Sequence, residues 1–242
     1  MRLDRRRQPF ALASALLAGA ALVMPRMEAR QNQAKVLPLE TAAGLRVSNL
    51  KITPATLDGK KGVQLSSTGV EEVALIEGIE FDNGVIEAEL AGTPGPGAGE
   101  GARGFVGMAF RVQKDMQAYD AFYLRPTNGR ADDQERRNHV TQYISHPEWT
   151  WSRLRKETPS RYESYVDMVP NTWTRIKIDV SGARASLYVH DQPQPVLIVN
   201  DVKTGPQGRG GVGLWVGSGT VAHFRNVRVQ PAIGKGGAPP PD

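Results

Sequence analysis

The chain has 242 residues, is 40% hydrophobic, contains 26 glycines and 17 prolines, and has no cysteine. The lack of cysteine excludes disulfides, thiolate metal sites and cysteine nucleophiles, and the glycine and proline content is typical of a turn-rich β protein. The formal net charge of +5 does not indicate a nucleic-acid partner, because most of it lies near the N-terminus.

Residues 1–34 are predicted to form a secretory signal peptide. An arginine-rich start is followed by an apolar, uncharged run over residues 10–24 and then by small residues, which is the order of a signal sequence. The run is shorter than the roughly 20 residues that span a bilayer, although an uncleaved anchor is the alternative. We therefore expect a secreted or periplasmic protein with no membrane span after cleavage.

The remainder of the chain is nearly neutral. Residues 1–34 carry six arginines against two acidic residues, whereas the residues after them carry 24 basic and 23 acidic side chains. A balanced surface offers no field for phosphates, so we expect no nucleic-acid partner.

Apolar and polar residues alternate along most of the mature chain, and this pattern predicts strands. Residues 175–180 alternate strictly. Turn signals at residues 82–84 and 181–182 predict two hairpins, and one short helix is expected near residues 135–139. The predicted strands cover residues 45–52, 62–67, 73–81, 85–90, 104–112, 119–124, 140–145, 162–168, 173–180, 185–189, 196–199 and 211–216, with a last run that ends at residue 229.

These elements predict a single domain over residues 35–233, followed by a disordered tail over residues 234–242. About a dozen short strands separated by turn signals are typical of two packed antiparallel sheets. Residues 92–104 are rich in glycine and proline and are expected to form a flexible loop. The fold class is therefore an all-β sandwich.

Several phrases occur in an order that suggests a known fold: FDNGVIEAEL, GFVGMAFR, YDAFYLRPTNG, WTRIKIDVSGARASLYV and GGVGLWVG. In these phrases the chain resembles the concanavalin A-like lectin/glucanase superfamily, especially its laminin-G-like bacterial members and domains of the 3-keto-disaccharide hydrolase type. The resemblance implies a two-sheet antiparallel jelly roll whose concave sheet meets sugars. It does not separate lectins from glycosidases and adhesion modules.

Alternation in the predicted strands suggests which side chains share the sugar-facing surface. We expect Arg111, Tyr123, Arg125 and Tyr143 to point away from the core. Aromatic rings stack on the apolar face of a pyranose, and arginines donate paired hydrogen bonds to hydroxyls or carboxylates. The alternative is that these residues are ordinary solvated sheet positions with cross-strand packing.

A polar stretch over residues 128–161 contains two tryptophans, Trp149 and Trp151. Long loops on a rigid scaffold often carry binding residues, so both tryptophans are candidate binding platforms. The alternative is that they only pin the loop to the sandwich.

The sequence contains no complete catalytic motif. Glu87 and Glu89 share one face of a strand, and we expect that face to be the exposed outer one. The four histidines are scattered without metal spacing, so no cofactor and no catalytic metal are expected. Asp132 and Asp133 could supply oxygens to a structural calcium ion, but two adjacent acids are far from a complete site. A structural calcium ion is therefore neither predicted nor excluded.

We therefore expect an exported carbohydrate-binding, lectin-like domain. The alternatives are a glycan-active hydrolase of the 3-keto-disaccharide type and a structural or adhesion module without catalytic activity. A hydrolase needs two acids, or an acid and a histidine, that converge in the groove, and Glu148, Asp120 and His146 are its candidates. The sequence does not identify the glycan or the oligomeric state.

Overall fold

The computed structural model describes residues 34–67 and 70–232. Both the expected signal peptide, except Ala34, and the expected tail over residues 234–242 lie outside the described residues. Among the residues described, no helix is long and apolar enough to cross a membrane.

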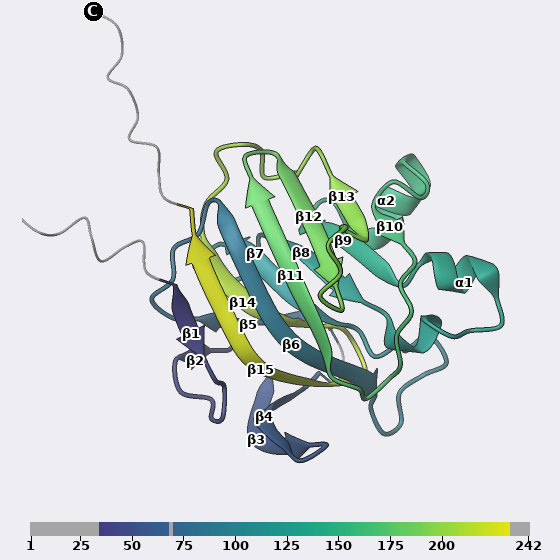
Figure 1. Ribbon diagram of the computed structural model, residues 1–242, viewed down its shortest axis with the longest axis horizontal. Coiled ribbons are helices and arrows are strands. Elements are labelled where there is room, and N and C mark those ends of the chain that lie inside the picture. Colours follow the sequence, from purple (N-terminus) through teal and green to yellow (C-terminus); the bar gives the residue numbers. More distant parts are fainter. Residues whose placement is uncertain (1–33, 68–69, 233–242) are drawn as a thin grey trace, which may run out of the picture.

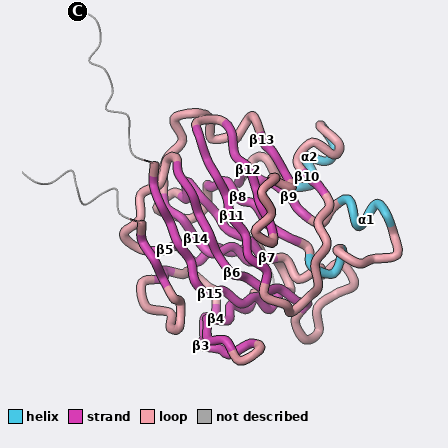
Figure 2. Tube along the Cα trace, viewed as in Figure 1, coloured by secondary structure: helices cyan, strands magenta, loops and turns pink. Residues whose placement is uncertain are grey.

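Two antiparallel sheets pack face to face (Figure 1), and strands are far more extensive than helices (Figure 2). The eight-stranded sheet has the order β13 (Leu197–Val199), β12 (Arg184–Val189), β11 (Thr174–Ser181), β6 (Gly84–Pro94), β15 (Thr220–Pro231), β4 (Lys60–Ser66) and β3 (Lys51–Leu57), with β1 (Lys35–Leu37) paired to β15. The seven-stranded sheet has the order β10 (Glu163–Ser164), β9 (Thr141–His146), β8 (Tyr119–Leu124), β7 (Val106–Val112), β14 (Gly211–Val216), β5 (Glu72–Ile76) and β2 (Leu45–Arg46). The two-sheet antiparallel sandwich predicted from the sequence is confirmed.

Alternation along the strands fills the space between the sheets. Ile176, Ile178 and Val180 of β11 are each at most 2% exposed, and the first two lie opposite the buried Ala88 and Ile86 of β6. Met108 and Phe110 of β7 are fully buried in the same core. The face of β11 that the sequence predicted as apolar is therefore part of the core.

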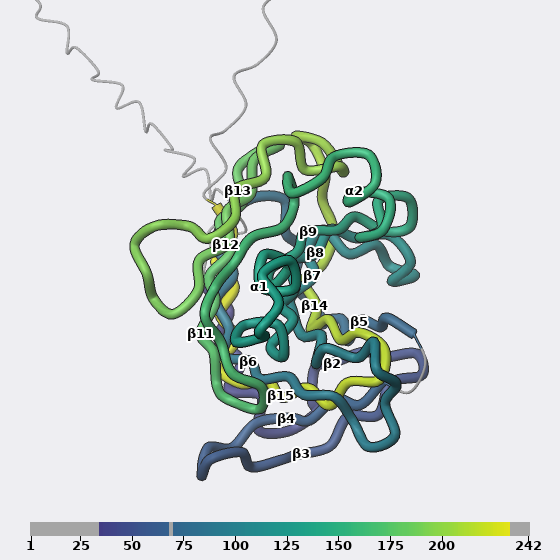
Figure 3. Tube along the Cα trace, turned by 90° about the vertical axis from the view of Figure 1, so that its right-hand side faces the viewer, coloured from purple at the N-terminus to yellow at the C-terminus, as the bar shows by residue number. Residues whose placement is uncertain are grey.

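Helices are few and lie beside the seven-stranded sheet. The helix expected near residues 135–139 is α1 (Gln134–Asn138), and a second helix, α2 (Trp151–Glu157), was not predicted. A short 3-10 turn, η2 (Pro126–Asn128), follows β8. Figure 3 views the sandwich from the side of α1, with β11 and β12 on the left and β8, β9 and β14 on the right; α2 lies beyond β9, on the outer side of the seven-stranded sheet.

One of the two predicted hairpins is present and the other is wrong. The turn at residues 181–182 joins β11 to β12, which pair from Ser181 opposite Arg184. The turn at residues 82–84 does not form a hairpin, because β5 pairs only within the seven-stranded sheet and β6 only within the eight-stranded sheet. The predicted strand over residues 45–52 is likewise divided between the two sheets, as β2 and β3.

Candidate functional site

Aromatic rings cover the outer face of the seven-stranded sheet. In β8, Phe122 faces the core and stacks on Phe110 at 6.2 Å, so the alternate residues Tyr119 and Tyr123 face outward. The Tyr123 ring stacks on Trp215 of β14 with centroids 4.4 Å apart, and Trp215 Nε1 donates a 3.2 Å hydrogen bond to the Tyr119 hydroxyl. The two tyrosines line the floor of a groove, and Trp215 packs beside them.

A glycine between the rings allows them to meet. Gly107 of β7 lies opposite both Tyr123 of β8 and Trp215 of β14. A Cβ atom at Gly107 would lie 2.2 Å from the Phe122 carbonyl oxygen and 2.6 Å from Tyr123 Cα. The missing side chain leaves room for the two neighbouring rings to stack across β7.

Two pockets adjoin along this outer face. Their volumes are about 640 and 340 Å³, within the range of about 300–1,000 Å³ common for small-molecule sites. We call them the large pocket, which contains Tyr119, and the small pocket, which contains Tyr123. Glu71, Trp151 and Ser218 line both of them, so the two pockets make one groove.

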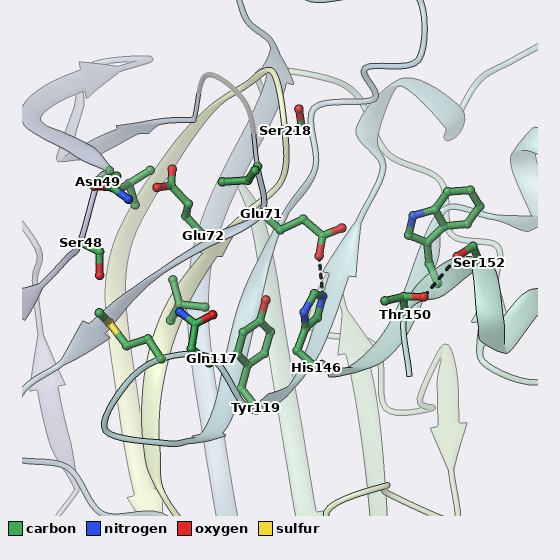
Figure 4. A pocket seen from close by; sticks show the side chains of 15 residues that line it. Ser48, Asn49, Glu71, Glu72, Gln117, Tyr119, His146, Thr150, Ser152 and Ser218 are labelled. Carbon is green, nitrogen blue, oxygen red and sulfur yellow. Dashed lines mark hydrogen bonds and ion pairs between the residues drawn. The ribbon is translucent and has the colours of Figure 1, made fainter. Parts of the chain in front are cut away.

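A carboxylate and an imidazole meet in the large pocket (Figure 4). Glu71 precedes β5 and His146 ends β9, and Glu71 Oε2 lies 2.7 Å from His146 Nε2. Their side chains are 27% and 23% exposed, so a bound molecule can reach both. The His146 ring also stacks on Tyr119 with centroids 4.9 Å apart.

An ion cluster supports the floor of the small pocket. Arg125, which follows β8, donates to the Tyr123 hydroxyl at 2.7 Å, and its Nη1 lies 3.3 Å from Glu163 Oε1 in β10. Arg155 of α2 donates from Nε to Glu163 Oε2 at 3.1 Å, and His139 Nδ1 lies 2.9 Å from the same oxygen. Burial lowers the pKa of His139, and the nearby arginines add to this effect while Glu163 opposes it. Glu163 therefore joins three elements below the groove.

The sequence-predicted residues are divided between two places. Tyr123, Arg125 and Trp151 line the small pocket. Arg111 and Tyr143 line neither pocket of the groove but belong to a buried network, in which the Tyr143 hydroxyl donates to Asp120 Oδ1 at 2.6 Å and Thr204 donates to Asp120 Oδ2. The expectation that these four residues share one surface is therefore wrong.

Local backbone geometry explains why Arg111 and Tyr143 do not face the groove. Between β7 and β14 the register shifts, so that Val112 and Phe110 are paired while Arg111 is not, and Arg111 has a φ of +54°. This is a β-bulge, which redirects a side chain against strict alternation. The Arg111 guanidinium instead donates to the carbonyl oxygens of Asp82, Gly182 and Gly205. Tyr143 lies directly opposite Phe122 and therefore faces the core with it.

The two tryptophans, Trp149 and Trp151, differ in their position relative to the groove. Trp151, at the start of α2, is 41% exposed and lines both pockets. Trp149 is partly buried against the core and lines neither, and Arg153 and Lys203 lie over its ring at 3.9 and 4.5 Å. Trp149 thus packs the segment against the sandwich, whereas Trp151 forms a wall of the groove.

Of the three residues named for a hydrolase, only His146 lies in the groove. Asp120 is fully buried in the network with Tyr143, and Glu148 is exposed and lines neither pocket. The carboxylates that line the large pocket are the consecutive Glu71 and Glu72. Glu87 and Glu89 pair with Arg228 and Arg225 of the neighbouring strand β15.

Within residues 34–67 and 70–232, no group of three or more His, Asp or Glu side chains is arranged to hold a metal ion. Asp133 caps α1, since its Oδ1 accepts from the Arg136 N–H at 2.7 Å. The calcium that the sequence left open at Asp132 and Asp133 stays untested.

The charged residues of the site that were not predicted include Glu71, Arg103, Arg136 and Glu163. Arg103 comes before β7 and Arg136 belongs to α1, yet both line the small pocket. Gly104 has a φ of +71°, and a Cβ there would lie 2.8 Å from Thr93, so this glycine turns the chain into β7 and fixes Arg103 beside the pocket. No sequence motif joins these four positions.

Comparison with solved structures identifies proteins that have a similar fold. A carbohydrate-binding module, CBM66 from Bacillus subtilis, matches with a TM-score of 0.54 and 18% identity over 77% of this chain and 96% of that one. The Crh5 transglycosylase in complex with NAG matches with a TM-score of 0.51 and 12% identity over 84% and 86% of the two chains. The exoplasmic/lumenal domain of VIP36, in a form bound to Ca²⁺ and Man3GlcNAc, matches with a TM-score of 0.50 and 10% identity over 80% and 90%.

The protein has a concanavalin A-like jelly-roll fold. This confirms the fold that the sequence resemblance implied. No protein-family model matches the chain, and no curated protein matches it significantly. At these identities the likeness concerns the fold alone.

Proposed function

We propose that this protein is an exported carbohydrate-binding protein that holds a glycan in the groove over the seven-stranded sheet. The observation that carries the proposal is the pair of adjoining pockets, with tyrosines on the floor and the exposed Trp151 shared between them. An exposed indole beside hydrogen-bonding groups suits a pyranose ring, which has one apolar face and a rim of hydroxyls. The fold shared with a carbohydrate-binding module supports this proposal, as the signal-like N-terminus supports export.

Replacing Trp151 tests the groove. The wild-type chain is screened on a glycan array, and the oligosaccharide that binds best is titrated by calorimetry against Trp151→Ala. We expect a loss of affinity of about tenfold, equivalent to about 1.4 kcal/mol, with the melting temperature unchanged because Trp151 is 41% exposed.

A matched control removes an aromatic ring from the opposite sheet. Tyr188 of β12 lies under Lys177 at 3.9 Å, as Trp151 lies under Arg155 at 4.9 Å, and Tyr188→Ala is expected to bind the glycan like the wild type. If no oligosaccharide binds the wild-type chain, or if both variants lose affinity equally, the proposal is overturned.

A second candidate function, glycan-active hydrolysis, is favoured by one observation. Glu71 and His146 form a hydrogen-bonded acid–histidine pair inside the groove. A carboxylate that accepts from Nε2–H leaves Nδ1 as the basic nitrogen, an arrangement suited to general base catalysis.

Mass spectrometry of oligosaccharides incubated with the protein distinguishes the two functions. A hydrolase releases shorter products, and Glu71→Gln stops their release while Glu80→Gln, which removes an exposed carboxylate outside both pockets, does not. If every oligosaccharide that binds stays intact, the hydrolase is excluded for those glycans and binding alone remains.

A further inference from the structure

Four arginines from four separate segments line the small pocket. They are Arg103 from the loop before β7, Arg125 after β8, Arg136 from α1 and Arg155 from α2. Glu71 is the acidic residue among the side chains that line this pocket. Arginines that the fold gathers from such distant positions give the pocket a marked positive charge.

Two of these arginines are neutralised and two are not. Arg125 and Arg155 share the carboxylate of Glu163, and Glu71 is engaged with His146. Arg103 and Arg136 form no ion pair with any carboxylate of the described residues. Arg103 donates to the carbonyl oxygens of Ala102, at 2.9 Å, and of Glu100, and Arg136 donates to Asn128 Oδ1 at 3.5 Å. Two guanidinium groups at the pocket therefore keep unneutralised charge.

Repulsion between the arginines of the small pocket supports the conclusion that part of their charge is unneutralised. The pKa of Arg103 is lowered by burial, then by the positive charges of Arg136 and Arg125. A bound anion would relieve the repulsion between them. On the opposite sheet, in contrast, Arg225 and Arg228 each pair with a glutamate.

The chemistry of the walls narrows the kind of anion. A guanidinium offers a planar fork of donors that matches a carboxylate in two parallel hydrogen bonds. The same pocket is lined by Tyr123, Phe105 and Trp151, whose rings need an apolar surface to pack against. A sugar ring that carries a carboxylate supplies both surfaces, whereas a small inorganic anion supplies only the charge.

We infer that the small pocket binds the uronic acid unit of an acidic glycan, with Arg103 and Arg136 receiving its carboxylate. This inference rests on the proposed glycan-binding function and names the class of glycan. The large pocket has a different character, because Glu71, Glu72, Asn49 and Gln117 line it and no arginine does so among its lining residues. The groove is therefore positively charged at one end and lined by carboxylates at the other, which directs the acidic unit to the end near α1 and α2.

Methyl esterification provides a direct test, since it removes the charge of a uronic acid and keeps its ring. The full chain is titrated with oligogalacturonate, oligomannuronate and oligoglucuronate, and with the methyl ester of each. We expect at least one of the acids to bind, with an affinity that decreases at higher salt, and its ester to bind at least about tenfold more weakly.

Arginine variants then locate the carboxylate. Arg103→Gln and Arg136→Gln are each expected to weaken binding of the acidic oligosaccharide about tenfold and to leave its ester unaffected. Arg136 is exposed and Arg103 is half-buried, so both variants should keep the wild-type melting temperature. Arg184→Gln removes an exposed arginine from β12 in the opposite sheet and is the control for a general loss of charge.

The possible outcomes distinguish a failure of the uronic acid inference from a failure of the proposed glycan-binding function. Equal binding of acids and esters, or binding that neither arginine variant alters, overturns the uronic acid inference and leaves carbohydrate binding intact. A preference for sulfated over carboxylated oligosaccharides also overturns it. If no oligosaccharide of either kind binds, in these titrations or on the glycan array, the proposed function itself fails.

Discussion

At the scale of single residues, Glu163 has the largest predicted effect on stability. Its side chain is 3% exposed and neutralises Arg125, which is 6% exposed, together with Arg155. Glu163→Gln leaves a buried guanidinium without its counter-charge, and we expect the free energy of unfolding to fall by about 3 kcal/mol. Urea denaturation followed by tryptophan fluorescence measures the loss.

A neighbouring ion pair is the control for Glu163. Glu157 and Arg153 also form a Glu–Arg pair, at 2.9 Å on α2, but their side chains are 47% and 40% exposed. Glu157→Gln should cost only about 0.5 kcal/mol or less, because solvent screens the charges. Equal losses in the two variants would contradict the structural role of Glu163.

Side-chain direction was the least predictable property of single residues. Alternation correctly placed Tyr123 and Arg125 on one face, because β8 is regular from Tyr119 to Leu124. It failed for Arg111 because a bulge depends on the partner strand β14, and for Tyr143 because its direction depends on the register with β8. Neither pairing can be read from the residues of one strand alone.

At the scale of elements, the hairpin between β3 and β4 depends on one glycine. Leu57 pairs with Lys60, so Asp58 and Gly59 form a two-residue turn with φ values of +49° and +71°. Gly59→Ala would force a Cβ into the left-handed region, and we expect a loss of about 1 kcal/mol in the free energy of unfolding. Differential scanning calorimetry measures the accompanying decrease in melting temperature.

Gly99 provides the comparison for Gly59. A Cβ atom at either glycine would meet nothing within 4 Å, but only Gly59 of the two has a left-handed φ. Gly99→Ala should leave stability within about 0.5 kcal/mol of the wild type. A similar destabilisation in both variants would show that the cost does not come from backbone conformation.

Turn signals predict a change of direction but not the strand that follows it in space. The sequence Asp82-Asn83-Gly84 does end one strand region and begin another, yet the chain crosses there from the seven-stranded to the eight-stranded sheet. In contrast, Ser181 and Gly182 connect β11 and β12, which are neighbouring strands of one sheet. Whether a turn joins two paired strands or crosses between sheets depends on long-range packing, which the residues of the turn do not determine.

At the scale of the whole molecule, periodicity was enough to predict a two-sheet sandwich, because burial of one face per strand is a property of each strand. The site was less predictable, since its charges come from segments that only the complete fold brings together. Arg103, Arg136 and Glu71 meet around the small pocket although no local pattern relates them. A groove that depends on the whole fold should lose its ligand affinity and its structure together.

The pH dependence of stability is a property of the whole molecule that the structure predicts. Burial lowers the pKa of His223 below its ordinary value of 6.5, and burial is the first cause of the same shift in His139. The unfolded chain therefore binds protons more readily than the folded one near and below pH 6.5. The stability that these two histidines contribute is therefore fully present above this pH and is lost as the pH falls.

The contribution of His223 can be isolated by substitution. A histidine that stays neutral in the folded state costs up to about 1.4 kcal/mol for each pH unit below 6.5, so the free energy of unfolding of the wild type should decrease between pH 7.5 and pH 5.0. In His223→Gln this decrease should be smaller, whereas His190→Gln, which removes an exposed histidine, should retain the wild-type slope. Chemical denaturation at several pH values measures all three slopes, and a slope that is the same in His223→Gln and in the wild type would exclude His223 as a source of the acid sensitivity.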